Sequence, residues 1–168
     1  MKTFNYCPSC GSRDISFDNI KRFRCKACSF IYFHNVAAAA AAILEYNKKI
    51  ILIRRSKEPG KGKLDLPGGF ADPNETAEDA VRREIGEELK INIGMLKYVG
   101  SYPNAYEFEG VSYRTCDLFF FSEIEILPTD FDRAEIEEIV LIDPAEIPLS
   151  EIAFESTKMC LELFARNA

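Results

Sequence analysis

The chain has 168 residues, of which 47% are hydrophobic and 29% are charged, so it can bury the core of one medium-sized domain beside a small module. Its net charge of −6 argues against broad nonspecific binding of nucleic acid, which needs a basic surface to neutralise phosphates. No signal peptide is recognisable and the apolar run "VAAAAAAIL" is too short to span a bilayer, so we expect a cytoplasmic protein without a membrane segment.

Four of the six cysteines form two CxxC knuckles near the start of the sequence. Cys7 and Cys10 make the first knuckle, Cys25 and Cys28 make the second, and fourteen residues lie between them. This spacing is typical of a tetrahedral site in which four thiolates bind structural Zn²⁺. The alternative is two disulfides, which require an oxidising compartment that nothing else in the sequence indicates.

Residues 1–34 contain few large aliphatic side chains, and their aromatic residues cannot make a core at this size. We therefore predict a zinc ribbon over residues 1–34, in which the metal supplies much of the folding free energy. His34 is the single histidine, and we interpret it as a surface or packing residue because the thiolate set is already complete. Cys116 and Cys160 have no partner at ligand spacing and are interpreted as core thiols.

Residues 35–168 contain mixed strands with helices before and after them, which indicates an α/β layered domain. Alanine propensity would favour a helix at "VAAAAAAILEY", but the turn "NKK" and the run "IILIRR" predict a hairpin whose first strand is Ala37–Leu44. The stretch after it is rich in Gly and Pro and predicts a loop with a short strand at Leu64–Leu66. Later strands are expected at residues 95–102, 112–122 and 136–142, and a last helix at residues 155–167.

The stretch "TAEDAVRREIGEELKI", residues 76–91, predicts an amphipathic helix that begins at Thr76 with a capping-box pattern. At about 100° per residue, Glu84, Glu87 and Glu88 fall in the same sector as the apolar stripe. A solvated helix would place its acids on the opposite face, and acids three or four apart repel by roughly 0.2–0.5 kcal/mol per pair. Clustered carboxylates suit a hard cation such as Mg²⁺ or Mn²⁺; the alternative is acids paired elsewhere in the fold.

The helix belongs to a longer run of fixed residue types. Gly69 is followed by five residues, Glu75, seven residues, the sequence "REIGEE" at 83–88, and Ile91. This run resembles the signature of the Nudix hydrolases, which cleave nucleoside diphosphates linked to another moiety. One position departs from the family pattern, because Lys90 stands where glycine usually permits a left-handed helix end. The resemblance covers residues 36–150 and implies a Nudix-type α/β/α sandwich with a mixed sheet, preceded by the zinc ribbon.

The resemblance also implies a role for each matching residue of the helix. Glu84, Glu87 and Glu88 would bind the catalytic Mg²⁺ or Mn²⁺, and Glu84 would also orient or deprotonate the attacking water. Arg83 and Glu75 would pair to hold the preceding loop against the helix. Two or more metal ions could then neutralise the pyrophosphate, activate water and steady the leaving phosphate.

Residues outside the helix complete the expected site. Gly68 and Gly69 would let the backbone pass close to the metal and the pyrophosphate. Glu135 is a candidate further metal ligand, with an exposed loop acid as the alternative. Basic side chains after the hairpin either contact phosphates or form a solvated charged end; they are Arg54, Arg55, Lys57, Lys61 and Lys63.

A narrower resemblance concerns the substrate. A CxxC pair set before a Nudix domain is similar to the zinc-containing NADH pyrophosphatases. In "SYPNAYEFE", residues 101–109, Ser101 and Pro103 match the substrate motif of that subfamily and Tyr106 replaces an aromatic residue, whereas the tryptophan, two later prolines and the final serine are absent. The resemblance implies cleavage of NADH or NAD⁺ to AMP and a nicotinamide mononucleotide. Tyr102 and Tyr106 would stack on a ring or, alternatively, pack a loop.

The sequence is also compatible with other substrates and with a second class of function. ADP-ribose and diadenosine polyphosphates are alternative substrates within the same reaction class. A different class is a non-catalytic ligand sensor whose zinc ribbon contacts nucleic acid or protein. The intact carboxylate set favours an enzyme with a small-molecule nucleotide substrate, because a sensor would not need to activate water. The sequence leaves the oligomeric state open, a homodimer included.

Overall fold

The computed structural model describes residues 4–18 and 21–167 and divides into two compact units, one ending at Val36 and one beginning at Ala37. Residues 1–3, 19 and 20 of the expected 1–34 ribbon and residue 168 of the expected 35–168 domain lie outside the described residues. The domain ranges 1–34 and 35–168 stay a prediction.

The first unit holds a three-stranded antiparallel sheet with one buried aromatic ring. Its strands are β1 (Ile15–Asp18), β2 (Arg22–Cys25) and β3 (Ile31–Phe33). Phe23 is 2% exposed, and its ring centroid lies between 5.4 and 6.1 Å from those of Phe4, Phe17, Phe30 and Tyr32. The half-buried ring of His34 meets that of Tyr32 edge-on at 6.4 Å, which is a packing contact.

The second unit is built on a seven-stranded mixed sheet. Five strands lie side by side in the order β10, β5, β4, β9, β8, while β6 pairs with β5 and β7 pairs with β4. Only the β4–β9 pair among these is parallel. The strands are β4 (Ala37–Tyr46), β5 (Lys49–Arg55), β6 (Leu64–Asp65), β7 (Gly68–Phe70), β8 (Lys97–Phe108), β9 (Val111–Glu123) and β10 (Ile136–Ile142).

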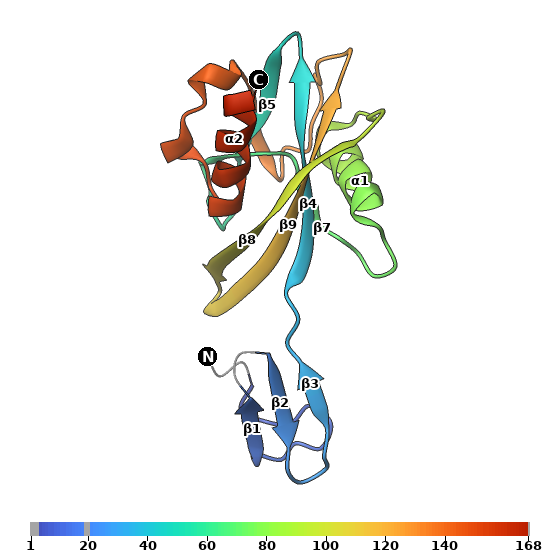
Figure 1. The fold of residues 1–168 in the computed structure, drawn as a ribbon, viewed down its shortest axis with the longest axis vertical. Coiled ribbons are helices and arrows are strands. Elements are labelled where there is room, and N and C mark those ends of the chain that lie inside the picture. Colours follow the sequence, from blue (N-terminus) through green and yellow to red (C-terminus); the bar gives the residue numbers. More distant parts are fainter. Residues whose placement is uncertain (1–3, 19–20, 168) are drawn as a thin grey trace. The chain divides into compact units, whose positions relative to one another are not determined.

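Helices cover both faces of this sheet, α1 (Ala77–Leu89) on one side and α2 (Glu155–Asn167) on the other (Figure 1). Consecutive residues of β4 point to opposite faces, as the period of a strand requires. Ala42 and Leu44 pack in the cluster that contains Ile85 of α1, whereas Ile43 packs in the cluster that contains Leu161 of α2. The expected α/β/α sandwich with a mixed sheet is confirmed.

The expected hairpin at the start of this unit is also confirmed. Strands β4 and β5 pair through Tyr46 and Lys49, and the two residues between them, Asn47 and Lys48, have φ of 49° and 62°. Positive φ at both positions is the conformation of a two-residue hairpin turn whose twist matches that of the strands. The β-sheet pairing therefore outweighs the helix propensity of the alanine run. Strand β10 and helix α2 have the ranges expected from the sequence.

Helix α1 ends earlier than expected. Its last residue is Leu89, and Lys90 adopts a left-handed conformation with φ of 56°, so Ile91 reaches the core from the segment after the helix. The Lys90 ammonium donates to the Glu87 carbonyl at 2.7 Å, which satisfies one group of the last turn. Lysine thus occupies the position and conformation that glycine has in the family pattern.

Strand β8 is longer than expected and takes in most of the segment interpreted as a substrate loop. Residues 101–108 lie in β8 and pair with β9 across a two-residue turn at Glu109 and Gly110, both with positive φ. Pro103 lacks an N–H group, but β8 is at the edge of the sheet, where proline is tolerated. The strand expected at residues 95–102 thus extends to Phe108, and Tyr106 lies on a strand rather than in a loop.

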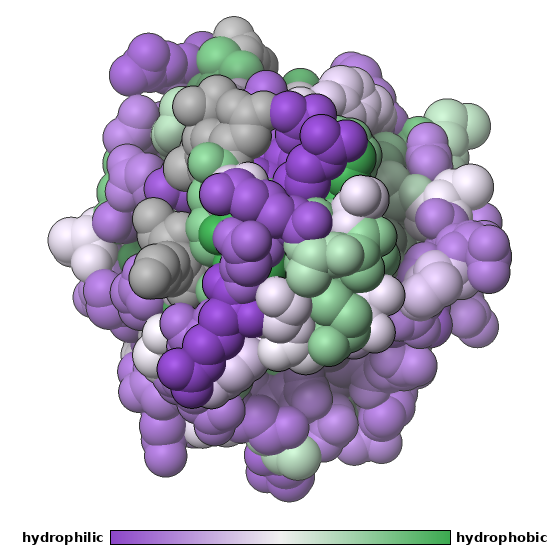
Figure 2. All heavy atoms as spheres, turned by 90° about the horizontal axis from the view of Figure 1, so that it is seen from below, coloured by the Kyte–Doolittle hydropathy of each residue, from purple (hydrophilic) through white to green (hydrophobic). Residues whose placement is uncertain are grey.

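No helix among residues 4–18 and 21–167 is long and apolar enough to cross a bilayer. Figure 2 shows hydrophilic side chains over most of the face that it draws, with smaller hydrophobic areas between them.

Candidate active site

Strand β7 brings two glycines against the acidic face of α1. Gly68 has φ of 145°, and a Cβ there would lie 2.2 Å from the Ala40 carbonyl oxygen of β4, so only glycine fits. Its N–H donates to Glu88 Oε2 at 2.9 Å. A Cβ on Gly69 would lie 2.5 Å from the carboxylate carbon of Glu84. Gly68 therefore lets β7 lie close against β4, and Gly69 lets its backbone lie directly on the Glu84 carboxylate.

Helix α1 begins with the expected N-cap. The Thr76 hydroxyl accepts the Asp79 N–H at 3.1 Å and donates to the Asp79 carboxylate at 2.7 Å. This cap starts the helix in the register that places Ile85 and Leu89 in the core and Glu84 and Glu88 at its margin. Of the three acids, Glu88 is buried, Glu84 is half-buried and Glu87 is exposed.

Arg83 binds the loop before α1 to the acids on α1. Its guanidinium donates to both oxygens of Glu75 at 2.9 and 3.0 Å and to the Phe70 carbonyl at 2.9 Å. The same guanidinium donates through Nη1 to Glu84 at 2.9 Å and to Glu87 at 3.1 Å. The Arg83–Glu75 pair that the family resemblance implies is thus present, and Arg83 is also the main cation beside the acids.

The electrostatics of these groups follow their surroundings. Burial raises the pKa of Glu88 to about 8. The nearby charge of Glu84 also raises this pKa, whereas the hydrogen bond from the Gly68 N–H lowers it. Burial also raises the pKa of Glu84, although the Arg83 hydrogen bond opposes the shift. The hydrogen bond from Arg83 lowers the pKa of Glu75. The protein without metal therefore carries less negative charge at this margin than the count of acids indicates.

These acids line part of a cleft of about 480 Å³ in the second unit. Its walls come from β4, β7, α1, β8, β9 and the start of α2, with Glu135 just before β10. Glu135 pairs with Lys57 at 3.1 Å and its side chain is about half exposed. Glu84, Glu87, Glu88 and Glu135 all border this cleft, so the structure gathers the four expected metal ligands.

Although these four acids border one cleft, their carboxylate oxygens do not converge as the ligands of one metal ion do. Among residues 4–18 and 21–167, the only group of three or more His, Cys, Asp or Glu side chains that converges as metal ligands do is the cysteine set. Arg83 Nη1 occupies oxygens of both Glu84 and Glu87, so a cation has to replace this guanidinium contact. The donor set itself is all oxygen and carries several negative charges, which fits Mg²⁺ or Mn²⁺.

The residues of β8 that were expected to bind substrate do not all reach the cleft. Tyr106 lines the cleft, and its ring lies 5.6 Å from that of Phe154. Tyr102 is half-buried against the cluster on the α2 side, with its ring 6.0 Å from that of Phe119, and does not line the cleft. Ser101 and Pro103 are exposed and lie outside the cleft lining.

One of the five expected basic residues reaches the cleft. Arg55 donates to the Pro59 carbonyl at 2.8 Å and to Asp65 at 3.2 Å, and its guanidinium lies 5.0 Å from the Phe154 ring centroid. Burial raises the pKa of Asp65 to about 6, although Arg55 opposes the shift. Arg54 pairs with Glu138 at 2.6 Å outside the cleft, and Lys57 pairs with Glu135 as described.

The sequence interpretation missed a polar set in the β8–β9 part of the cleft. Asn104 of β8 lies opposite Thr115 of β9, and Asp117 follows two residues later on the same face of β9. All three are at least nine-tenths buried and line the cleft. A signal existed, because a strand that reads "TCDLFFF" carries polar residues at i and i+2 where an apolar face is expected.

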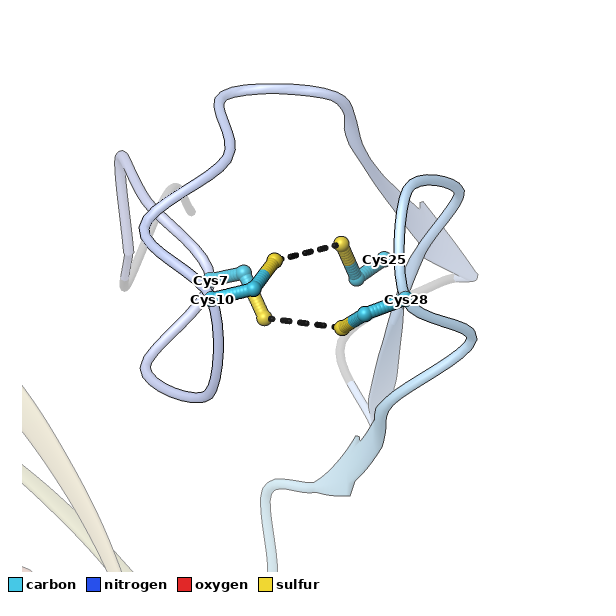
Figure 3. Close-up of side chains that lie close together, drawn as sticks. All are labelled: Cys7, Cys10, Cys25 and Cys28. Carbon is cyan, nitrogen blue, oxygen red and sulfur yellow. Dashed lines mark hydrogen bonds between the residues drawn. The ribbon is translucent and has the colours of Figure 1, made fainter.

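The four knuckle cysteines of the first unit face one another from two loops (Figure 3). Sγ of Cys7 lies 3.7 Å from that of Cys28, Sγ of Cys10 lies 3.6 Å from that of Cys25, and all four sulfurs are within 4.8 Å of one another. A tetrahedron with Zn–S bonds of about 2.3 Å has edges of about 3.8 Å. The four are free thiols rather than disulfides, so their chemistry and spacing fit Zn²⁺.

Local backbone geometry makes the two knuckles alike. Gly11 and Ser29, each directly after the second cysteine of its knuckle, have φ of 72° and 61°. The backbone N–H of Cys28 lowers the pKa of the Cys25 thiol, whereas the pKa of Cys10, although the N–H of Ser12 opposes the shift, is raised by the neighbouring thiols. Cys160 is buried and Cys116 half-buried, and neither belongs to this set.

Comparison with protein families identifies the second unit. A family model described as "NUDIX domain" matches residues 34–162, so the chain belongs to the Nudix family. A crystal structure of a NUDIX hydrolase from Nitrosomonas europaea superposes with a TM-score of 0.71 at 26% identity, covering 96% of this chain and 90% of that one.

Two curated relatives differ in their named activities. The chain is 27% identical over 105 residues to the NAD-capped RNA hydrolase NudC of Vibrio parahaemolyticus, which is 62% of this chain and 40% of that protein. It is 39% identical over 86 residues to the ADP-ribose pyrophosphatase of Methanocaldococcus jannaschii, which is 51% of this chain and 47% of that protein. The matched stretch thus spans less than half of either relative.

Proposed function

We propose that this Nudix protein is a metal-dependent hydrolase that cleaves the pyrophosphate of a nucleoside diphosphate linked to another moiety. The observation that carries the proposal is the contact of β7 with α1, where Gly68 and Gly69 lie on the carboxylates of Glu88 and Glu84. This contact places backbone and acids at the margin of one cleft. Membership of the Nudix family and the activities named for the relatives support the same reaction.

In the proposed site the helix acids and Glu135 would hold divalent metal. Bound Mg²⁺ or Mn²⁺ would neutralise the pyrophosphate and lower the pKa of water. Glu84 orients or deprotonates the water whose oxygen attacks phosphorus, and the bond from that phosphorus to the bridging oxygen breaks. Arg83 holds Glu84, Glu87 and the Glu75 loop in place, which is a positioning role.

For the substrate, we propose a dinucleotide such as NADH or NAD⁺, cleaved to AMP and a nicotinamide mononucleotide. The cysteine knuckles and the likeness to a NudC protein support this choice. ADP-ribose is the second candidate, because the archaeal ADP-ribose pyrophosphatase has the higher identity, 39% over 86 residues. Zn²⁺ at the four cysteines is assigned a structural role, since a closed thiolate tetrahedron leaves no position for water.

The test is a hydrolysis panel with Mg²⁺ and with Mn²⁺, in which chromatography resolves the products from NADH, NAD⁺, ADP-ribose and diadenosine polyphosphates. We expect AMP and a mononucleotide from NADH, with less than about tenfold preference over ADP-ribose in kcat/KM, because the substrate motif of the subfamily is only partly present. Strong hydrolysis of ADP-ribose without any mononucleotide from NADH or NAD⁺ would establish the second candidate instead. No hydrolysis of any compound would refute the enzyme assignment.

A further inference from the structure

The cleft wall made by β9, which β4 separates from the β7 strand that contacts α1, contains two buried oxygens that have no hydrogen-bond partner among the described residues. They are Thr115 Oγ1 and Asp117 Oδ1. Thr115 is 3% exposed and Asp117 is 9% exposed, and both line the cleft. An unpaired buried polar atom is unfavourable for folding, so its presence at a cleft wall indicates a group that binds from the cleft.

The other oxygen of Asp117 is already occupied. Ser156, in the first turn of α2, donates its hydroxyl to Asp117 Oδ2 at 2.5 Å. This contact holds the carboxylate between β9 and α2 and leaves Oδ1 as the free acceptor. Since a carboxylate only accepts hydrogen bonds, a ligand that pairs with Oδ1 must carry a hydrogen-bond donor.

The neighbouring residues indicate which other chemical groups a ligand would need. Asn104, across the β8–β9 pair from Thr115, adds an amide that both donates and accepts. Tyr106 and Phe154 form an aromatic wall, with ring centroids 5.6 Å apart and planes at 50°. A flat ring that packs on this wall and carries an N–H donor at its edge matches both features.

We propose that this part of the cleft is a subsite for a planar ring bearing an NH₂ group, which Asp117 and Thr115 recognise. The assignment rests on the hydrolase function proposed above, whose substrates offer two sources of that group: the amino group of adenine and the carboxamide of nicotinamide. The carboxylate of Asp117 also repels anions, so the phosphates would lie toward the divalent metal proposed at the helix acids. Asp117, Thr115 and Asn104 are then residues that determine specificity.

The experiment measures binding rather than hydrolysis, so that its outcome is independent of the proposed activity. NMR titrations with Mg²⁺ present compare AMP with inosine monophosphate, in which a ring carbonyl replaces the amino group; neither compound has a pyrophosphate to cleave. A second pair compares nicotinamide mononucleotide with nicotinic acid mononucleotide, in which a carboxylate replaces the carboxamide. We expect the NH₂-bearing member of at least one pair to bind roughly tenfold more tightly, and that pair identifies the source.

The variant Asp117→Asn sharpens this test. Its side-chain oxygen can still accept from Ser156, which turns the amide NH₂ toward the cleft, so the preference for the NH₂-bearing ligand should disappear or reverse. In Thr115→Val the unpaired hydroxyl is lost, so the protein should unfold at the same or a higher temperature while its affinity for the preferred ligand falls. Cys116→Ser, one residue away on the opposite face of β9, should leave both preferences unchanged.

The assignment is overturned by any of three results. The first is equal binding within both pairs, or no measurable binding of all four mononucleotides. The second is a preference that Asp117→Asn leaves as large as in the parent. The third is a Thr115→Val variant that keeps its full affinity, since the hydroxyl would then make no contact with the ligand.

Discussion

At the level of a single residue, Glu88 links the fold to the proposed metal site. It is 6% exposed, it accepts the N–H of Gly68, and burial raises its pKa to about 8. The ordinary pKa of this group is 4.5, so the folded protein without metal retains a proton that the unfolded chain loses at lower pH. The stability linked to Glu88 is therefore complete below pH 4.5 and is lost as pH rises through about 8.

Replacing Glu88 with Gln should remove the loss of stability at high pH. Gln still accepts the Gly68 N–H but cannot ionise, so in metal-free buffer the variant should match the parent near pH 4.5 and exceed its free energy of unfolding above pH 8, by on the order of a few kcal/mol. Denaturant unfolding with a chelator at both pH values measures the difference. Glu87→Gln, at an exposed position, is the control and should show little change.

Turnover should fall in the same two variants, although their stability is kept or increased. Glu87→Gln and Glu88→Gln should each lose orders of magnitude in turnover with Mg²⁺, because each removes a negative ligand from the proposed site. Steady-state hydrolysis of NADH or ADP-ribose is the measurement, with Glu78→Gln on the exposed first turn of α1 as the control. Near-parental turnover in either cleft variant would show that the metal assignment is wrong.

At the level of elements, the contact of β7 with α1 decides how the acids are held. A Cβ on Gly69 has to share space with the Glu84 carboxylate, which is the movable end of a side chain. Gly69→Ala should therefore cost little stability but move Glu84 away from Arg83 and from the metal. We expect roughly a hundredfold lower kcat with a nearly unchanged unfolding temperature.

The matched control for this variant is Gly94→Ala, since no atom lies within 4 Å of a Cβ at that position. It should keep the kcat and unfolding temperature of the parent. If Gly69→Ala also keeps its kcat, the exact position of Glu84 is unimportant for the reaction. If Gly69→Ala unfolds instead, the contact is structural and the argument for precise placement fails.

At the level of the whole molecule, we expect the stability of the first unit to depend on the four cysteines. Phe23 is the single ring among its large aromatic residues that is almost fully buried, so apolar burial alone contributes little to this unit. The thiolate set should supply the remaining stability once it binds metal.

We expect about one zinc per chain by elemental analysis. Removing zinc with a chelator, or replacing Cys25 with Ser, should lower the unfolding temperature of the first unit while Mg²⁺-dependent turnover in the second unit persists. Absence of zinc, or thiol titration showing two disulfides in freshly purified protein, would contradict this prediction. Loss of turnover together with zinc would contradict the structural role.

The parts of this protein that could be predicted from sequence are those with local causes. The 3.6-residue period placed Glu84 and Glu88 beside the apolar stripe of α1, the CxxC spacing indicated the thiolate set, and the turn at Asn47 and Lys48 predicted the hairpin. Each of these patterns arises from geometry within a few residues, or from a ligand set with fixed chemistry.

Only the tertiary structure shows which side chains of β8 and β9 line the cleft. Asn104 and Thr115 meet because β8 and β9 pair in one register, and Ser156 reaches Asp117 from 39 positions along the chain because α2 packs on that face of the sheet. Periodicity shows which residues of a strand share a face but not which strand or helix that face meets, since pairing and packing depend on the whole sheet. For that reason Ser101 and Pro103, matched by motif, lie outside the cleft, whereas Asp117, which no motif indicated, lines it.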